Sequence, residues 1–316
     1  MELRDAPLER RVWCALVGAE RVLGFRLARW LGTVAMRCGS RTERGFVKSA
    51  HRTVHPTATA PHLIRLPTSW WSSSPVVRAR RLGLDLELDL RDNLQRCVYF
   101  AGTYEPALLS FLRQELRAGD VFVDVGAHIG VHSLTAAARL RDLGGGTVIA
   151  FEPAGHSAAK LRAAAVANGL DLMVVEEALG SEACTAHLFA DPAYGSDDGG
   201  CWSLYAEGPV IQSVPVVTFD AWARDAELEA VDVIKLDIEG CELEALRGMR
   251  SSLRRFRPRA LVTEVKSRLM RRAGVEEPAL RDFLADCGYV STGQVMPFGN
   301  ELFRPMGAAV EPEPWA

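Results

Sequence analysis

VFVDVGAHIG, residues 121–130, has the pattern of a buried strand that carries Asp124 near its end, turns through Gly126 and opens a helix at Gly130. A glycine turn of this kind lets the backbone approach a bound ligand closely. Such turns serve dinucleotides and S-adenosylmethionine alike. The G-x-G-x-x-G spacing that seats a pyrophosphate on a helix N-terminus is absent, because only Gly126 and Gly130 are present. The stretch therefore predicts a parallel sheet with a ligand site at this turn, and it disfavours NAD.

Short apolar runs alternate with helical stretches from Glu105 onward, which is the pattern of βαβ units. We therefore expect an α/β, Rossmann-like fold, with helices on both faces of a mainly parallel sheet. Residues 184–220 are too long for a plain connection, so they predict inserted antiparallel strands with a mobile loop that could act as a lid. The predicted strands are 121–125, 147–151, 172–176, 231–236 and 260–264, and the predicted helices are 130–140, 157–168 and 242–253.

The N-terminal part of the chain follows different patterns. Apolar residues at helical spacing predict an amphipathic helix over residues 8–37. Residues 40–80 contain four prolines and runs of Ser and Thr, which indicate a linker or an irregular covering segment. Residues 82–90 alternate between leucine and mostly polar residues, the period of a half-buried antiparallel strand. We therefore divide the chain into a basic, partly helical extension, 1–81, and a ligand-binding domain, 82–316, that carries the insertion.

Charge is distributed unevenly along the chain. Residues 1–83 carry 15 Lys and Arg against five Asp and Glu, whereas residues 84–316 carry 22 against 35. The basic extension could pack on the acidic body of its own chain, or meet a carrier protein, a membrane surface or the second subunit of a homodimer. Nucleic acid is not expected as a partner, because no aromatic-and-basic motif of a known RNA- or DNA-binding module occurs.

The cysteines and the hydropathy pattern bound the cellular setting. Seven scattered cysteines form neither a CxxC pair nor a zinc-ligand pattern, so we predict a reduced protein without a zinc site. No stretch of about 18 uncharged apolar residues occurs, and no signal peptide is recognisable. These features predict a cytoplasmic protein.

A carboxylate follows the second predicted strand. Glu152 lies 28 residues after Asp124, at the position where an acidic side chain could accept hydrogen bonds from the two hydroxyls of an adenosine ribose. The alternative is an ordinary surface glutamate before Pro153. The glycine turn upstream favours the ribose role.

Further carboxylates follow the apolar run 231–236. VDVIKLDIEGCE, residues 231–242, places Asp237, Glu239 and Glu242 at a strand's carboxyl end. Carboxylates clustered there need a cation, a metal ion or a shared proton. Glu242 could instead stabilise the start of the following helix. Lys235 lies among apolar neighbours and needs a partner such as a carboxylate.

Seven short motifs follow one another along the chain: Tyr104-Glu-Pro106, Asp124-Val-Gly-Ala-His-Ile-Gly130, Phe151-Glu-Pro153, Ala178-Leu-Gly180, Val217-Thr-Phe-Asp220, Lys235-Leu-Asp-Ile-Glu-Gly-Cys-Glu242 and Pro258 to Glu264. In this order they resemble those of the FkbM-type methyltransferases, and the resemblance covers about residues 84–290. His128 is a departure, because the glycine turn of that family usually has Asn there. The resemblance implies a class I methyltransferase fold with a seven-stranded sheet, S-adenosylmethionine as donor, and O-methylation of a sugar, polyketide or other secondary metabolite.

The resemblance and the strand ends together give a set of candidate site residues. We expect Asp237, Glu239 or Glu264 to act as general base toward a hydroxyl acceptor. Asp237 and Glu264 could equally hold Mg²⁺, and spacing does not decide between the two roles. The residues expected to bind the donor are Tyr104, Glu105, Asp124, Gly126, Ala127, His128, Gly130, Glu152, Ala178 and Asp237.

Two other functions stay open from the sequence. An NAD-dependent oxidoreductase could use the same kind of sheet, although the third glycine and a Tyr-x-x-x-Lys pair are both absent. A non-catalytic S-adenosylmethionine-binding or scaffold protein could act through the basic extension. The sequence does not identify the methyl acceptor, because fold alone does not fix a substrate.

Overall fold

A computed structural model describes residues 76–190, 202–205, 208–265, 270–271, 273–296 and 299–307. The helix predicted over residues 8–37 lies outside the described residues, as do residues 191–201 of the segment 184–220 in which a lid was expected. The chain divides into two compact units, Met1–Val77 with Leu88–Tyr104, and Arg78–Glu87 with Glu105–Ala316. The second unit contains the sheet, and the site is described within it.

The central sheet of this unit has seven strands. Neighbouring strands pair in parallel except at β13, which is antiparallel to both of its neighbours. All four residues of the central strand β10 are buried, as expected for a parallel sheet covered on both faces. The strand order is β12 (Tyr289–Val295), β13 (Asn300–Pro305), β11 (Ala260–Glu264), β10 (Val233–Leu236), β3 (Val121–Val125), β4 (Thr147–Phe151) and β5 (Met173–Val175).

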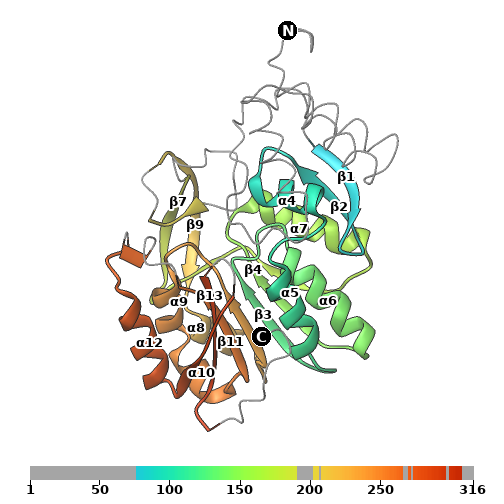
Figure 1. Cartoon of the computed structure of the whole chain (residues 1–316). Helices are drawn as coiled ribbons and strands as arrows, with labels where there is room; N and C mark the ends of the chain where they lie inside the picture. The colour runs from blue at the N-terminus through green and yellow to red at the C-terminus, as the bar shows by residue number, and fades with distance from the viewer. Residues whose placement is uncertain are drawn as a thin grey trace, which may run out of the picture. The chain divides into compact units, whose positions relative to one another are not determined.

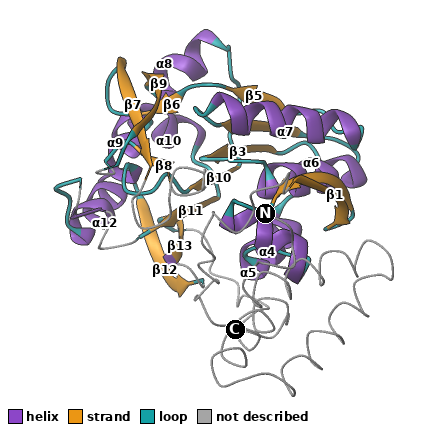
Figure 2. Cartoon of the chain, turned by 90° about the horizontal axis from the view of Figure 1, so that it is seen from above, coloured by secondary structure: helices purple, strands orange, loops and turns teal. Residues whose placement is uncertain are grey.

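Helices cover both faces of this sheet (Figures 1 and 2). One face is covered by α5 (Pro106–Glu115), α6 (Val131–Leu143) and α7 (Gly155–Ala167), and the other by α8 (Phe219–Asp225), α9 (Glu242–Gly248), α10 (Arg250–Phe256) and α12 (Glu277–Asp286). Among the described residues, no helix is both long and apolar enough to cross a membrane. The seven-stranded, mainly parallel sheet between two helical layers confirms the predicted fold class.

The single helix predicted over residues 242–253 is wrong. The structure has two short helices, α9 and α10, which are separated by the non-helical backbone of Met249 (φ −116°, ψ 14°). A Cβ atom on Gly248 would lie 2.0 Å from the carbonyl oxygen of Gly180. Helix α9 therefore ends where its last residue packs against another backbone segment, a tertiary contact that no periodicity in the sequence reveals.

Residues 76–80, predicted to be irregular, are also ordered as a strand. β1 (Val76–Arg81) and β2 (Leu84–Asp89) form a two-stranded sheet. Leu82 and Gly83 lie between them with φ of 56° and 81°, values typical of a tight hairpin turn. Asn168, after α7, fixes β2 at Asp85, because its Oδ1 accepts the Asp85 N–H at 2.8 Å and its Nδ2 donates to the Asp85 carbonyl at 2.9 Å. The predicted domain boundary at 81/82 falls in this turn and stays a prediction.

The inserted segment forms a second sheet. Its four strands have the order β6 (Ala178–Leu179), β9 (Val210–Val217), β7 (Cys184–Ala190) and β8 (Trp202–Ser203). β7 pairs antiparallel with both β8 and β9, which confirms the inserted antiparallel strands. β6 runs parallel to β9 and connects this sheet to the end of β5.

Candidate functional site

Two glycines fix the turn after β3. Gly126 has a φ of 79° and Gly130 a φ of 83°, both in the left-handed region that favours glycine. A Cβ atom on Gly126 would lie 1.9 Å from the carbonyl oxygen of Asp237, and one on Gly130 would lie 2.0 Å from Cδ1 of Leu161. Both positions therefore exclude a side chain. The turn packs directly against the loop that follows β10 and against α7.

A buried ion pair lies beneath this turn. The Nζ atom of Lys235 lies 3.0 Å from Oδ1 of Asp124 and donates a 3.1 Å hydrogen bond to the carbonyl oxygen of Gly126. The hydroxyl of Ser133 donates to Oδ2 of Asp124 at 2.5 Å. Burial raises the pKa of Asp124, but Lys235 and the hydrogen bonds outweigh it, so that the pKa lies below its usual value. The expectation that Lys235 needs a carboxylate partner is confirmed.

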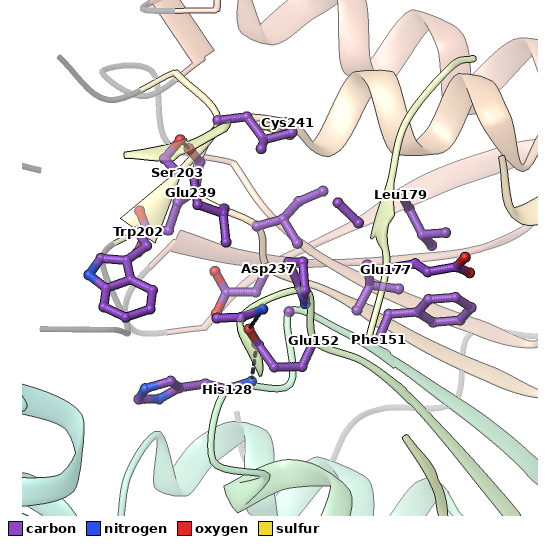
Figure 3. A pocket seen from close by; sticks show the side chains of 18 residues that line it. His128, Phe151, Glu152, Glu177, Leu179, Trp202, Ser203, Asp237, Glu239 and Cys241 are labelled. Atoms are coloured by element: carbon purple, nitrogen blue, oxygen red, sulfur yellow. Dashed lines mark hydrogen bonds between the residues drawn. The ribbon is translucent and has the colours of Figure 1, made fainter. Parts of the chain in front are cut away.

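Glu152 follows β4 and contacts the glycine turn. Its Oε2 accepts a hydrogen bond from the backbone N–H of His128 at 2.7 Å, and its Oε1 accepts one from Ala154 at 2.8 Å (Figure 3). Burial raises the pKa of this carboxyl, although His128 and the two hydrogen bonds oppose that effect. Each carboxylate oxygen can accept a further hydrogen bond. Glu152 can therefore bind hydroxyl groups of a ligand while it holds the turn.

A pocket of about 650 Å³, partly open to solvent, lies at the carboxyl ends of β3, β4 and β10. Parallel sheets bind their ligands at this edge. The inserted sheet supplies one wall, through Leu188 on β7 and Trp202 on β8. Figure 3 shows His128, Trp202 and Glu239 toward one end of the pocket and Phe151, Glu177 and Leu179 toward the other. Of the residues that the structure describes, no lysine or arginine lines the pocket, and four carboxylates do, those of Glu152, Glu177, Asp237 and Glu239.

The loop after β10 is held by Glu242. Oε1 of Glu242 accepts the backbone N–H groups of Ile238 and Gly240 at 3.1 Å, and Oε2 accepts that of Gly240 at 3.0 Å. Between these two residues, Glu239 has a φ of 55°. Burial raises the pKa of Glu242 to about 7, although the backbone hydrogen bonds oppose the shift. Glu242 thus supports the loop from behind and does not line the pocket.

Three carboxylates from two neighbouring strand ends converge beside the pocket. One oxygen atom each from Asp237, Glu239 and Glu264 lies within 4.8 Å of the others. Glu264 ends β11 and is buried, whereas the other two side chains are half-buried. Like charges at this spacing are favourable only with a cation or a shared proton. The set could hold a sulfonium, take up a proton, or supply the oxygen ligands that Mg²⁺ prefers.

Glu105 lies at the centre of another buried group of polar side chains in the same compact unit. Oε1 of Glu105 accepts a hydrogen bond from Nδ2 of Asn300 at 2.9 Å, and its Oε2 lies 3.3 Å from Nε2 of His132. Burial and the nearby ammonium of Lys235 lower the pKa of His132 to about 4, so the imidazole is neutral near pH 7. His132 and Asn300 were not expected at the site from the sequence. Neither stands in a recognisable motif, and Asn300 reaches Glu105 across 195 positions of the chain.

The structure separates the expected donor-binding residues into two groups. Those that line the pocket are Gly126, His128, Glu152, Ala178 and Asp237, together with the catalytic candidate Glu239. Glu105, Asp124, Ala127 and Gly130 are buried but do not line it, and neither does the catalytic candidate Glu264. Tyr104 belongs to the other compact unit, and its role stays a prediction.

The residues of the inserted sheet that line the pocket were not identified from the sequence. Trp202, Leu188 and Leu204 occur in no motif, although the insertion itself was recognised. Ser203 joins this sheet to the loop after β10, because its hydroxyl donates to the Glu239 carbonyl at 2.8 Å. Only the fold brings these two segments together.

Comparisons with known proteins give one family. The family model described as "Methyltransferase FkbM domain" matches residues 124–291, more than half of the chain. No curated protein matches the chain in sequence.

Several solved structures resemble the fold at low identity. A SAM-dependent methyltransferase from Agrobacterium tumefaciens aligns with a TM-score of 0.42 and 10% identity over 74% of this chain and 71% of that one. The M. jannaschii protein TYW2, in complex with AdoMet, aligns with 0.38 and 12% over 75% and 89%. Pyrococcus abyssi tRNA (uracil-54, C5)-methyltransferase, in complex with S-adenosyl-L-homocysteine, aligns with 0.38 and 13% over 73% and 44%, so the alignment spans less than half of that enzyme.

Proposed function

The chain belongs to the FkbM methyltransferase family, and on this premise we propose that it transfers the methyl group of S-adenosylmethionine to a hydroxyl group of a small molecule. Dependence on S-adenosylmethionine follows from the family. That the acceptor is a hydroxyl group goes beyond what the family gives. The observation that carries it is the group of carboxylates, Asp237, Glu239 and Glu264, beside a pocket that also contains Glu152.

The donor lies along the carboxyl edge of the sheet in this proposal. Glu152 accepts hydrogen bonds from the ribose hydroxyls, because its carboxylate lines the pocket and retains acceptor capacity. The adenine packs against the apolar end of the pocket at Phe151 and Leu179. The methionine end crosses Gly126, where the absence of a side chain permits close approach, and brings the sulfonium toward Asp237.

The reaction is an in-line displacement. Holding the acceptor oxygen about 3 Å from the methyl carbon accounts for much of the rate enhancement in such reactions. The acceptor hydroxyl must also lose its proton, and a carboxylate of Asp237, Glu239 or Glu264 accepts it as general base. Alternatively, a divalent cation held by the same carboxylates would lower the pKa of the acceptor hydroxyl.

The acceptor enters beside the inserted sheet. Trp202 and Leu188 give that side of the pocket an apolar wall, which suits the body of a sugar, polyketide or other secondary metabolite. We place the reaction in the cytoplasm, in accordance with the odd number of scattered cysteines in the sequence.

Transfer of an isotopic label tests the acceptor chemistry. The full chain is incubated with methyl-13C S-adenosylmethionine and a panel of small alcohols and amines, and the products are examined by NMR. We expect labelled O-methyl signals, which Asp237→Asn reduces at least about tenfold. Asp225→Asn, which removes an exposed carboxylate on α8, is the matched control and should behave as wild type. Labelled products methylated only on nitrogen would contradict the hydroxyl acceptor.

A further inference from the structure

A hydrogen bond joins the inserted sheet to the loop after β10. The hydroxyl of Ser203, on β8, donates to the carbonyl oxygen of Glu239 at 2.8 Å and accepts the backbone N–H of Tyr205 at 3.1 Å. Ser203 is 5% exposed, so little of it is open to water. Water cannot readily replace a buried hydroxyl, and losing this hydrogen bond therefore costs more than losing one at the surface.

The peptide group between Glu239 and Gly240 is held at both ends. Its carbonyl oxygen accepts the Ser203 hydroxyl, and its N–H, that of Gly240, donates to the two carboxylate oxygens of Glu242 at 3.1 and 3.0 Å. Glu239 has a φ of 55°, a conformation that a residue with a side chain adopts only where its surroundings stabilise it. Hydrogen bonds at opposite ends of a planar peptide fix its orientation. They therefore also fix the direction in which the Glu239 side chain leaves the backbone.

A second contact joins the same two segments. The backbone of Leu204 forms a hydrogen bond with the side chain of Cys241, the residue that follows the loop. Leu204 and Cys241 line the pocket, as do Trp202 and Ser203. β8 is the last strand in the order of the inserted sheet and pairs with β7. The two hydrogen bonds connect this strand, with the apolar wall that it carries, to the loop that carries Glu239.

We propose that Ser203 is a positioning residue for methyl transfer, which sets Glu239 at the acceptor side of the pocket and leaves the donor side unchanged. This inference rests on the proposed function, because it takes the carboxylates after β10 as the groups that act on the acceptor. Figure 3 shows Trp202 and Ser203 with Glu239, away from Phe151 and Leu179, where the adenine is placed.

Different contacts fix the donor side and the acceptor side. Glu152, which binds the ribose in the proposed function, is held by the backbone N–H groups of His128 and Ala154. The backbone of Glu239 is held by Ser203, from the inserted sheet. Loss of the Ser203 hydroxyl therefore disturbs the acceptor side first. A displacement of about 1 Å near the reacting atoms can lower a rate about a hundredfold, so even a small shift of the loop would be measurable.

Hydrogen exchange, measured by mass spectrometry on the full chain, tests the hydrogen bond itself. In Ser203→Ala the amide hydrogens of residues 238–241 should exchange about three- to tenfold faster than in wild type, because the loop loses an anchor. Ser213→Ala is the matched control. It removes a hydroxyl on β9 of the same sheet, which is hydrogen-bonded to His187, and should leave exchange in the loop unchanged. Unchanged exchange in Ser203→Ala would overturn the inference.

Turnover and donor affinity separate positioning from a general loss of structure. Ser203→Ala should lower kcat for methyl transfer to the best alcohol of the panel at least about tenfold. Its dissociation constant for S-adenosylhomocysteine, measured by calorimetry, should stay within about twofold of wild type. Ser203→Thr keeps the hydroxyl and should restore kcat to within about threefold of wild type, whereas Ser213→Ala should behave as wild type in both measurements.

The outcomes distinguish this inference from the proposed function. Three results would overturn the inference and leave the proposed function standing: equal turnover of Ser203→Ala and Ser213→Ala, a loss of donor affinity in Ser203→Ala as large as its loss of turnover, or a Ser203→Thr protein that protects the loop from exchange but is as slow as Ser203→Ala. The absence of any labelled O-methyl product from the wild-type chain would overturn both.

Discussion

A single residue, Lys235, connects three parts of the site. Its ammonium contacts Asp124 on β3, the carbonyl oxygen of Gly126 in the turn, and, at 4.0 Å, Asp237. The side chain is 2% exposed and that of Asp124 is fully buried, so each charge depends on the other for compensation. Removing one partner of such a pair leaves an isolated charge in a medium that solvates it poorly.

Lys235→Met should therefore destabilise the protein strongly. We expect the free energy of unfolding to fall by about 3–5 kcal/mol, as measured by urea denaturation at pH 7. Arg78→Met removes an exposed ion pair with Glu87 and is the control, with an expected change below about 1 kcal/mol. A Lys235→Met protein as stable as the Arg78→Met protein would show that Asp124 does not need this counterion.

Some of the contacts between these side chains could be predicted from the sequence. A lysine within the apolar run 231–236 required a carboxylate, and Asp124 in the preceding motif supplies it. It also indicated that Asp237, Glu239 and Glu264 stand at strand ends, and the fold brings their oxygens within 4.8 Å. The contact between Glu105 and Asn300 could not be predicted, because neither residue type demands the other and they lie far apart in the chain.

The glycine turn after β3 sets the shape of the site, because it packs against the loop that follows β10. Gly126→Ala would place a methyl group 1.9 Å from the Asp237 carbonyl and push the turn away from the loop after β10. We expect a loss of affinity for S-adenosylhomocysteine of at least about tenfold, measured by calorimetry. Gly119→Ala is the matched control. Its φ is also positive, at 83°, but nothing lies within 4 Å of the added methyl group, so it should reduce stability without reducing affinity.

The loop after β10 makes the stability of the protein depend on pH, through Glu242. The pKa of Glu242 is raised from its ordinary 4.5 to about 7, mainly by burial. Because the folded chain holds this proton more tightly than the unfolded chain, the stability contributed by Glu242 is fully present below pH 4.5. It is lost as the pH rises to about 7, by up to roughly 3 kcal/mol.

Glu242→Gln should remove that part of the pH dependence. Urea denaturation at about pH 5 and about pH 7.5 compares the variant with wild type, and the fall in unfolding free energy between the two pH values should be larger for wild type. Glu182→Gln, at an exposed site, should keep the wild-type dependence. If Glu242→Gln keeps it as well, Glu242 is not the titrating group.

Much of the fold of the whole molecule could be predicted from the periodicity of apolar residues and from the resemblance to a family. The apolar runs located five strands of the seven-stranded sheet, and the length of residues 184–220 indicated the inserted strands. The strand at residues 76–81 was not predicted, although it pairs locally with β2 across a two-residue turn. The break at Met249 could not be predicted, since it depends on a contact with distant backbone. For the same reason the wall formed by Leu188 and Trp202 became visible only in the fold.

One titration tests whether the methyl donor binds at the carboxyl edge of the sheet. Wild-type protein and Glu152→Ala, each shown to be folded by circular dichroism, are titrated with S-adenosylmethionine and with NAD. We expect micromolar binding of S-adenosylmethionine to wild type, at least about tenfold weaker binding to Glu152→Ala, and no binding of NAD. Binding of NAD alone, or equal affinity of wild type and Glu152→Ala for S-adenosylmethionine, would contradict this expectation.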